Sequence, residues 1–147
     1  MKKAIFALGC FWKPEESFSK LNGIIRTEVG YCGGNVDKTT YEDVCSGETN
    51  HAEVVKIEFD EKKISYEKLV EKFFEMHDPT TLNMQGPDVG TQYRSEIFFL
   101  DDEQKIIAEK VKINLNDKYK KKIIKNISKE KNYCKAEDYH QKYLDKN

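Results

Sequence analysis

The chain has 147 residues, and its 25 Lys and Arg side chains nearly cancel its 26 Asp and Glu side chains. This length is typical of one domain with its own core, so we expect a single domain over residues 1–147. The balanced charge argues against direct binding of nucleic acid, and no apolar run approaches the roughly 20 residues of a membrane helix.

The first ten residues contain a charged start, a short apolar run and a cysteine, as a bacterial lipoprotein signal does. The apolar run covers only residues 4–8, whereas the apolar region of a signal peptide has about 7–15 residues. We therefore expect no signal peptide and no membrane attachment. The expected location is the cytoplasm, where thiols stay reduced.

The N-terminal third alternates apolar runs with turn residues. Ala4 to Leu8 predicts a buried strand, and Pro14 with the two acids that follow predicts a helix whose first residue is the proline. Cys10 lies between these two elements. Gly23 to Tyr31 predicts a second strand, and the polar stretch that continues to Asn50 predicts a long loop, which is often functional.

The segment from His51 to Phe59 is informative because strand geometry places alternate residues on one face. Glu53 shares a face with three apolar residues, whereas the opposite face ends in two ionic residues. The sequence therefore directs Glu53 toward the core, where desolvation raises the pKa of a carboxyl group.

The second half of the chain predicts further helices and strands. Ser65 can cap a helix with apolar residues at helical spacing, and Asp78-Pro79 ends it. After an irregular stretch, the expected elements are a strand, a helix, a strand and a terminal turn or short helix: Arg94 to Leu100, from Asp101 onward, Lys121 to Ile127, and Asp138 to Leu144. This order predicts an α+β fold, a two-layer sandwich of helices on a mixed sheet.

The chain has four cysteines, none of them in a C-x-x-C pair: Cys10, Cys32, Cys45 and Cys134. With only three histidines, the spacing of a zinc site is missing, and we expect no metal. Cys10 precedes the expected helix start, where backbone N–H groups lower a thiol pKa; the alternative is a small buried apolar residue. Phe11 and Trp12 favour the first interpretation, because their rings could line an apolar pocket beside the sulfur.

A reactive cysteine, two aromatic rings and a buried acid suit an apolar substrate whose oxygen is protonated as sulfur attacks. A sulfoxide fits this description. The chain also resembles the type A peptide methionine sulfoxide reductases in six motifs that follow in the family's order: Gly9 to Trp12, Tyr41 to Gly47, His51 to Val55, His77 to Thr81, Gly90 to Ser95 and Ala136 to Gln141.

The resemblance implies that Cys10 attacks the sulfoxide sulfur and becomes a sulfenic acid, and that Glu53 protonates the oxygen. Phe11 and Trp12 would hold the substrate methyl group. Four residues would orient the oxygen or a water, although a tyrosine is often only a core residue: Tyr41, Asp88, Tyr93 and Tyr143. The resemblance also implies a ferredoxin-like core, no bound cofactor, and action on the S epimer of free and protein-bound methionine sulfoxide.

The sequence departs from the family pattern at its end, because no glycine-rich tail with a resolving cysteine precedes Asn147. Cys134 or Cys32 could resolve the sulfenic acid if either comes within disulfide distance of Cys10. Cys45 lies in a motif where a cysteine is usual, so we interpret it as structural. Otherwise thioredoxin, or glutathione with glutaredoxin, would attack the sulfenic acid directly. Two further replacements, Asn50 for glycine and Met84 for arginine, are expected to affect loops.

Two other hypotheses remain open from the residues. A thiol peroxidase would also use a low-pKa cysteine, but it leaves the aromatic pair unexplained. A lipoprotein or peptide-binding module would carry Cys10 acylated or merely buried.

Overall fold

The computed structural model describes residues 2–77, 83–85, 88–116 and 126–146. Its elements in chain order are β1 (Lys2–Leu8), α1 (Trp12–Ser19), β2 (Ile24–Cys32), α2 (Tyr41–Cys45), β3 (Ala52–Phe59), α3 (Tyr66–Glu75), β4 (Met84–Gln85), β5 (Asp88–Val89), η1 (Thr91–Tyr93), β6 (Ser95–Phe99), α4 (Asp102–Asn116), β7 (Asn126–Lys129), β8 (Cys134–Lys135), η2 (Asp138–His140) and α5 (Tyr143–Lys146). None of the helices in these ranges is long and apolar enough to cross a membrane.

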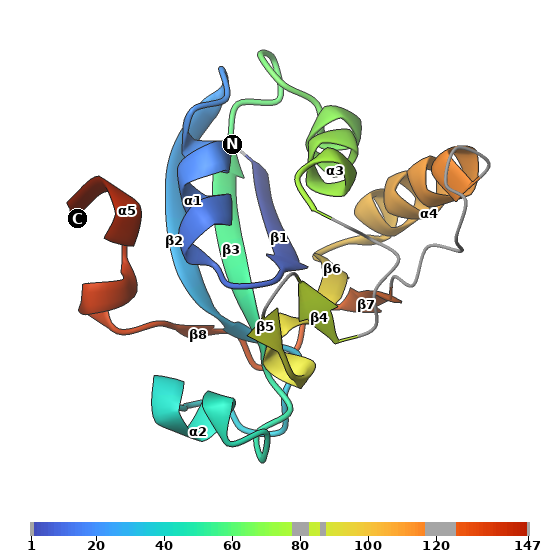
Figure 1. Ribbon diagram of the computed structural model, residues 1–147. Coiled ribbons are helices and arrows are strands. Elements are labelled where there is room, and N and C mark those ends of the chain that lie inside the picture. The colour runs from blue at the N-terminus through green and yellow to red at the C-terminus, as the bar shows by residue number, and fades with distance from the viewer. Residues whose placement is uncertain (1, 78–82, 86–87, 117–125, 147) are drawn as a thin grey trace.

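The main sheet has the strand order β7-β6-β1-β3-β2-β8 within the described ranges. Strand β7 runs parallel to β6, and the other neighbouring pairs are antiparallel. Strands β4 and β5 form a separate small hairpin near the end of β1 (Figure 1). The expected α+β arrangement of helices on a mixed sheet is confirmed. The ferredoxin-like core stays a prediction.

Helices α1, α3 and α4 cover the sheet (Figure 1). Helix α1 packs on β2 and β3, α3 contacts β1, and α4 packs on α3, β6 and β7. Phe6 of β1 joins these layers, because its ring stacks on Phe18 at 5.4 Å and on Phe73 at 5.3 Å. Aromatic stacking of this kind adds to apolar burial in fixing how α1 and α3 lie on the sheet.

The register expected for β3 is confirmed. Val55, Ile57 and Phe59 belong to the main core, and Glu53 on the same face is 1% exposed. The opposite face of β3 is more buried near its start than the sequence predicts, because Val54 packs there in a second buried cluster.

Helix α1 starts two residues earlier than the sequence predicts. Its first residue is Trp12, so Pro14 is the third residue. The helix tolerates this, because the first N–H groups of a helix have no intrahelical partner and proline loses nothing there. The first bond of the helical ladder runs from Glu15 N–H to the Phe11 carbonyl at 3.1 Å.

The two expected loops contain short elements. Thr40 accepts the Asp43 N–H and caps helix α2 inside the polar stretch before Asn50. The stretch after α3 contains the β4–β5 hairpin and η1, and its residues 78–82 and 86–87 lie outside the described residues. The final strand expected over 121–127 overlaps β7, which covers Asn126–Lys129. Residues 121–125 lie outside the described residues.

Candidate active site

Cys10 lies in the turn between β1 and α1, directly after Gly9. The turn requires glycine, because Gly9 has a φ of 97° and a Cβ there would lie 2.9 Å from the Gln85 side chain. Cys10 is half-buried and borders a cavity of about 230 Å³. The other lining residues come from β1, α1, the end of α3 and the hairpin: Leu8, Lys13, Pro14, Ser17, Met76, His77, Gln85 and Asp88.

The pKa of the Cys10 thiol is raised to about 11, chiefly because burial removes water from the charged form. The carboxylates of Glu53 and Asp88 raise this pKa further, and the Trp12 N–H at the start of α1 lowers it. The expected lowering by the helix is therefore present but outweighed. The prediction of a low-pKa thiol is wrong for the resting protein, because one N–H group does not compensate for lost hydration.

Glu53 faces this turn from β3. Its Oε1 accepts the N–H of Phe11 at 3.3 Å, so the acid is tied to the residue after Cys10. Its Oε2 is buried and has no hydrogen-bond partner among the described residues. Desolvation raises the Glu53 pKa to about 8, the Phe11 N–H opposes the rise, and the Asp88 charge adds to it. The raised pKa predicted from strand register is confirmed, and at neutral pH this carboxyl group holds its proton.

Phe11 and Trp12 have different surroundings: Phe11 lies in the core, and Trp12 forms part of an aromatic wall. Phe11 is 1% exposed and contacts the Tyr31 ring at 5.8 Å, so much of it belongs to the core. Trp12 is half-buried, and its ring stacks on Tyr143 at 3.8 Å with an interplanar angle of 11°. The structure therefore places Tyr143 against Trp12 as part of the aromatic wall.

Tyr41 and Tyr93 lie together beside Glu53. The Tyr41 hydroxyl is hydrogen-bonded with the side chains of Tyr93 and Cys45, and burial raises the pKa of both tyrosines. The Glu53 charge raises both pKa values further. The Tyr41 N–H donates to Glu137 at 2.9 Å, which fixes the start of α2. Two hydroxyl groups therefore border the buried acid.

The site therefore combines a half-buried thiol, a protonated acid, an aromatic wall and nearby hydroxyl groups. The family model for peptide methionine sulfoxide reductase matches residues 2–147. The chain belongs to this family. It is an oxidoreductase that reduces methionine sulfoxide.

Relatives support this membership in sequence and structure. The chain is 61% identical over 146 residues to the peptide methionine sulfoxide reductase MsrA of Pelagibacter ubique, and the match covers 99% of each chain. Its structure is similar to that of Mxr1 from Saccharomyces cerevisiae in reduced form, with a TM-score of 0.95 and 42% identity over 99% of this chain and 85% of that chain. It also matches Mxr1 in complex with Trx2, with a TM-score of 0.69 and 29% identity over 97% of this chain and 84% of that chain.

The reductase fold separates the two cysteines expected as resolving candidates. Cys32 is fully buried in the cluster behind the sheet, away from the face that carries Glu53, and burial raises its thiol pKa to about 12. Cys134 is half-buried in β8 and pairs with Tyr31, which in turn pairs with Glu53. Residues that pair directly share a face, so Cys134 lies on the Glu53 side, two strand spacings or about 10 Å away.

Cys45 is exposed on α2 beside Tyr41, and its structural role stays a prediction. Desolvation nevertheless raises its pKa, and the Tyr41 hydroxyl opposes this rise. Within the described ranges, no three His, Cys, Asp or Glu side chains are grouped as a metal site requires.

Sequence reasoning missed His140, which organises the aromatic wall. It is 2% exposed and contacts the rings of Tyr41 at 4.6 Å, Phe11 at 5.2 Å and Trp12 at 5.7 Å. The Trp12 indole N–H donates to His140 Nδ1 at 3.1 Å, so in the neutral ring the proton is on Nε2. The only sequence signal was its place in the motif Ala136 to Gln141.

Proposed function

We propose that this chain reduces the S epimer of methionine sulfoxide, free and in proteins, with Cys10 as nucleophile and Glu53 as acid. The observation that carries the proposal is the buried Glu53 carboxyl group, whose Oε2 has no partner among the described residues and whose pKa is raised to about 8. Such a group donates a proton to a substrate oxygen at neutral pH.

The proton balance follows from the two pKa values. Because the Cys10 thiol holds its proton at rest, attack requires a base beside it. Glu53 protonates the sulfoxide oxygen and, as the resulting carboxylate, takes the thiol proton while the Cys10 sulfur bonds to the sulfoxide sulfur. The hydroxyl group then moves to the Cys10 sulfur, the bond to the methionine sulfur breaks, and methionine leaves. The substrate gains two electrons and Cys10 becomes a sulfenic acid.

Other residues around Cys10 and Glu53 have supporting roles in this proposal. Phe11 and Trp12, with Tyr143 on the Trp12 ring, hold the methyl group. Tyr41, Tyr93 and Asp88 orient the oxygen or a water. Asp88 lines the cavity beside Cys10, and its charge acts on both Glu53 and Tyr93. One catalytic domain over residues 1–147 contains all of these groups.

An external thiol returns Cys10 to its reduced form. We propose thioredoxin as the donor, because Mxr1 was crystallised with Trx2, and glutathione with glutaredoxin as a second donor. Both donors are kept reduced in the cytoplasm, where we place the reaction. Of the internal candidates we favour Cys134, because Cys32 is buried behind the sheet. The segment that carries Cys134 has to approach Cys10, since a disulfide needs Cα atoms within about 7 Å.

The test incubates reduced protein with the separate S and R epimers of a methionine sulfoxide peptide, without donor, and measures methionine formed and thiols lost. We expect one methionine per chain from the S epimer alone. If the wild type loses two thiols and Cys134→Ser loses one, Cys134 is the resolving cysteine. If both proteins lose one thiol, the sulfenic acid is resolved by an external donor. Methionine from neither epimer would refute the proposed function. A thiol peroxidase is not favoured, because it leaves the aromatic wall formed by Trp12 and Tyr143 unexplained.

A further inference from the structure

One turn of α1 holds two consecutive residues of the C-terminal segment. Trp12 and Glu15 are three positions apart, so they lie on one face of the helix. The Trp12 ring stacks on Tyr143, and Glu15 Oε1 accepts the backbone N–H of Lys142 at 2.6 Å. The same helical turn therefore contacts the ring of one residue and the backbone of the residue before it.

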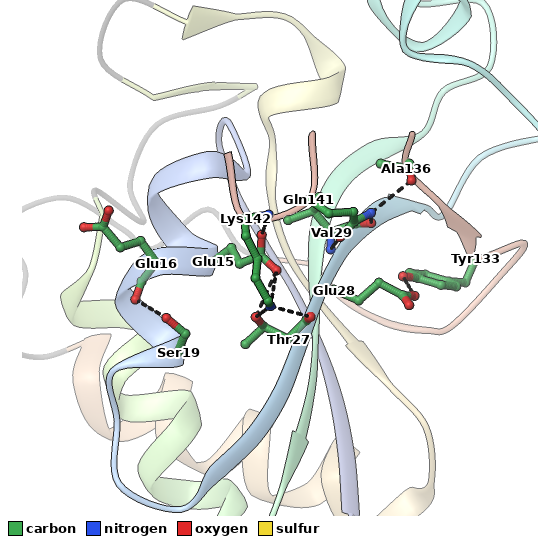
Figure 2. A network of polar contacts seen from close by, with 10 residues as sticks. All are labelled: Glu15, Glu16, Ser19, Thr27, Glu28, Val29, Tyr133, Ala136, Gln141 and Lys142. Carbon is green, nitrogen blue, oxygen red and sulfur yellow. Dashed lines mark hydrogen bonds and ion pairs between the residues drawn. The ribbon is translucent and has the colours of Figure 1, made fainter. Parts of the chain in front are cut away.

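Glu15 is built into this position. Its side chain is 3% exposed although it carries a carboxylate, and Oε2 accepts the Thr27 hydroxyl at 2.9 Å (Figure 2). The Lys142 Nζ lies 3.8 Å from Oε2, but its side chain is 52% exposed, so this ion pair contributes little. The short bond from the backbone N–H to the carboxylate is charge-assisted and is the strong contact.

The C-terminal segment depends on such anchors. Lys142 has a φ of 51°, an unfavourable conformation for a residue with a Cβ, and α5 begins at the next residue. A helix of four residues is not stable by itself. Gln141, the residue before Lys142, is fixed by its own side chain. Its amide oxygen accepts the Val29 N–H, and its amide nitrogen donates to the carbonyls of Val29 and Ala136 (Figure 2). The Glu15 bond then sets the direction in which α5, and Tyr143 with it, leaves Lys142.

We propose that Glu15 is a positioning residue for the sulfoxide pocket: its carboxylate holds the Lys142 backbone and thereby keeps Tyr143 stacked on Trp12. Glu15 touches no reacting atom and acts through these two rings. The kinetic part of this inference rests on the proposed function, and its structural part does not.

The decisive readout is fluorescence, because Trp12 is the only tryptophan in the chain. In Glu15→Ala we expect red-shifted emission and easier acrylamide quenching, as in Tyr143→Ala, with unchanged far-UV circular dichroism. With the S-sulfoxide peptide, kcat/KM falls about 10- to 100-fold, mainly through KM, since displacement of about 1 Å costs up to about 10²-fold. Glu15→Gln keeps an oxygen acceptor for the N–H and restores both readouts.

Two matched controls isolate the backbone bond. Glu16→Ala removes the adjacent carboxylate, which pairs with Lys13 and Lys20, and leaves both readouts as in the wild type. Lys142→Gly keeps the backbone N–H and suits the positive φ, while it removes the ion pair with Glu15 and the Nζ hydrogen bonds to the Thr27 carbonyl and hydroxyl. Because the backbone bond remains, it also leaves both readouts unchanged. If Glu15→Ala fails to fold, Glu15→Asp keeps the charge but is one methylene shorter, and we expect it to give the same red shift.

A double variant tests whether Glu15 acts through Tyr143. Adding Glu15→Ala to Tyr143→Ala should cause no further rise in KM, because the ring that Glu15 positions is already missing. Additive losses would overturn the inference, as would wild-type fluorescence and KM in folded Glu15→Ala or Glu15→Asp. If the wild type forms no methionine, the proposed function fails, and the fluorescence comparison still tests the positioning role.

Discussion

Glu53→Gln removes an ionisable group that folding keeps protonated, so it should change how stability depends on pH. The pKa of Glu53 lies at about 8 in the folded protein, against 4.5 for the free group. Because the folded pKa is raised, its stabilising effect is complete below pH 4.5 and is lost as pH rises toward 8. The glutamine variant has no such group, and Oε1 can still accept the Phe11 N–H.

The size of the effect follows from the two pKa values. They differ by about 3.5, and each unit corresponds to about 1.4 kcal/mol, so the full difference is about 5 kcal/mol. Relative to the wild type, the free energy of unfolding of Glu53→Gln should therefore rise by about 1.4 kcal/mol per pH unit between pH 5 and 8 and level off above pH 8.

Urea unfolding of both proteins at pH 5 to 9 measures this difference directly. Glu58→Gln is the matched control, because it lies on the same strand but on the half-exposed opposite face, and its difference from the wild type should stay flat. A flat difference for Glu53→Gln as well would mean that Glu53 is ionised in the folded protein, and the acid role would be refuted.

The same variant should lose activity while it keeps a reactive thiol. Loss of a general acid slows a step about 10²- to 10⁴-fold, so single-turnover formation of methionine should fall by this factor. The Glu53 charge raises the Cys10 pKa, and alkylation of Cys10 should therefore begin at a lower pH in the variant. An unchanged rate of methionine formation would contradict the proposed proton transfer.

Three further predictions concern the nucleophile, the oxygen-binding hydroxyls and the scaffold. Cys10→Ser should form no methionine in a single turnover, and appreciable product would exclude Cys10 as the nucleophile. Tyr93→Phe should slow the same step about 10²-fold, as loss of one oxyanion donor does, whereas Tyr133→Phe, whose hydroxyl bonds to Glu28, should not; equal rates would remove Tyr93 from the site. Ser65→Ala removes the acceptor for the Lys68 N–H at the start of α3 and should lower the free energy of unfolding by about 1 kcal/mol in urea, with unchanged kcat.

Several features of this reductase could be predicted from the sequence because they depend on neighbours along the chain. The two-residue period of β3 directed Glu53 to the core, and its burial and raised pKa follow from that alone. Ser65 caps α3 as its position before an apolar helical pattern predicts. The family followed from six motifs in order, and the matching family model confirms it.

Other features were decided only by tertiary structure, because they depend on groups that meet across the fold. The helix argument gave the wrong direction for the Cys10 pKa, since burial and two carboxylates outweigh one N–H group. Trp12 meets His140 across 128 positions, and Glu15 meets Lys142 across 127. Cys32 and Cys134 look equivalent in sequence, yet strand register puts them on opposite faces of the sheet. Periodicity and capping are local, whereas desolvation and these long-range contacts exist only after the chain has packed.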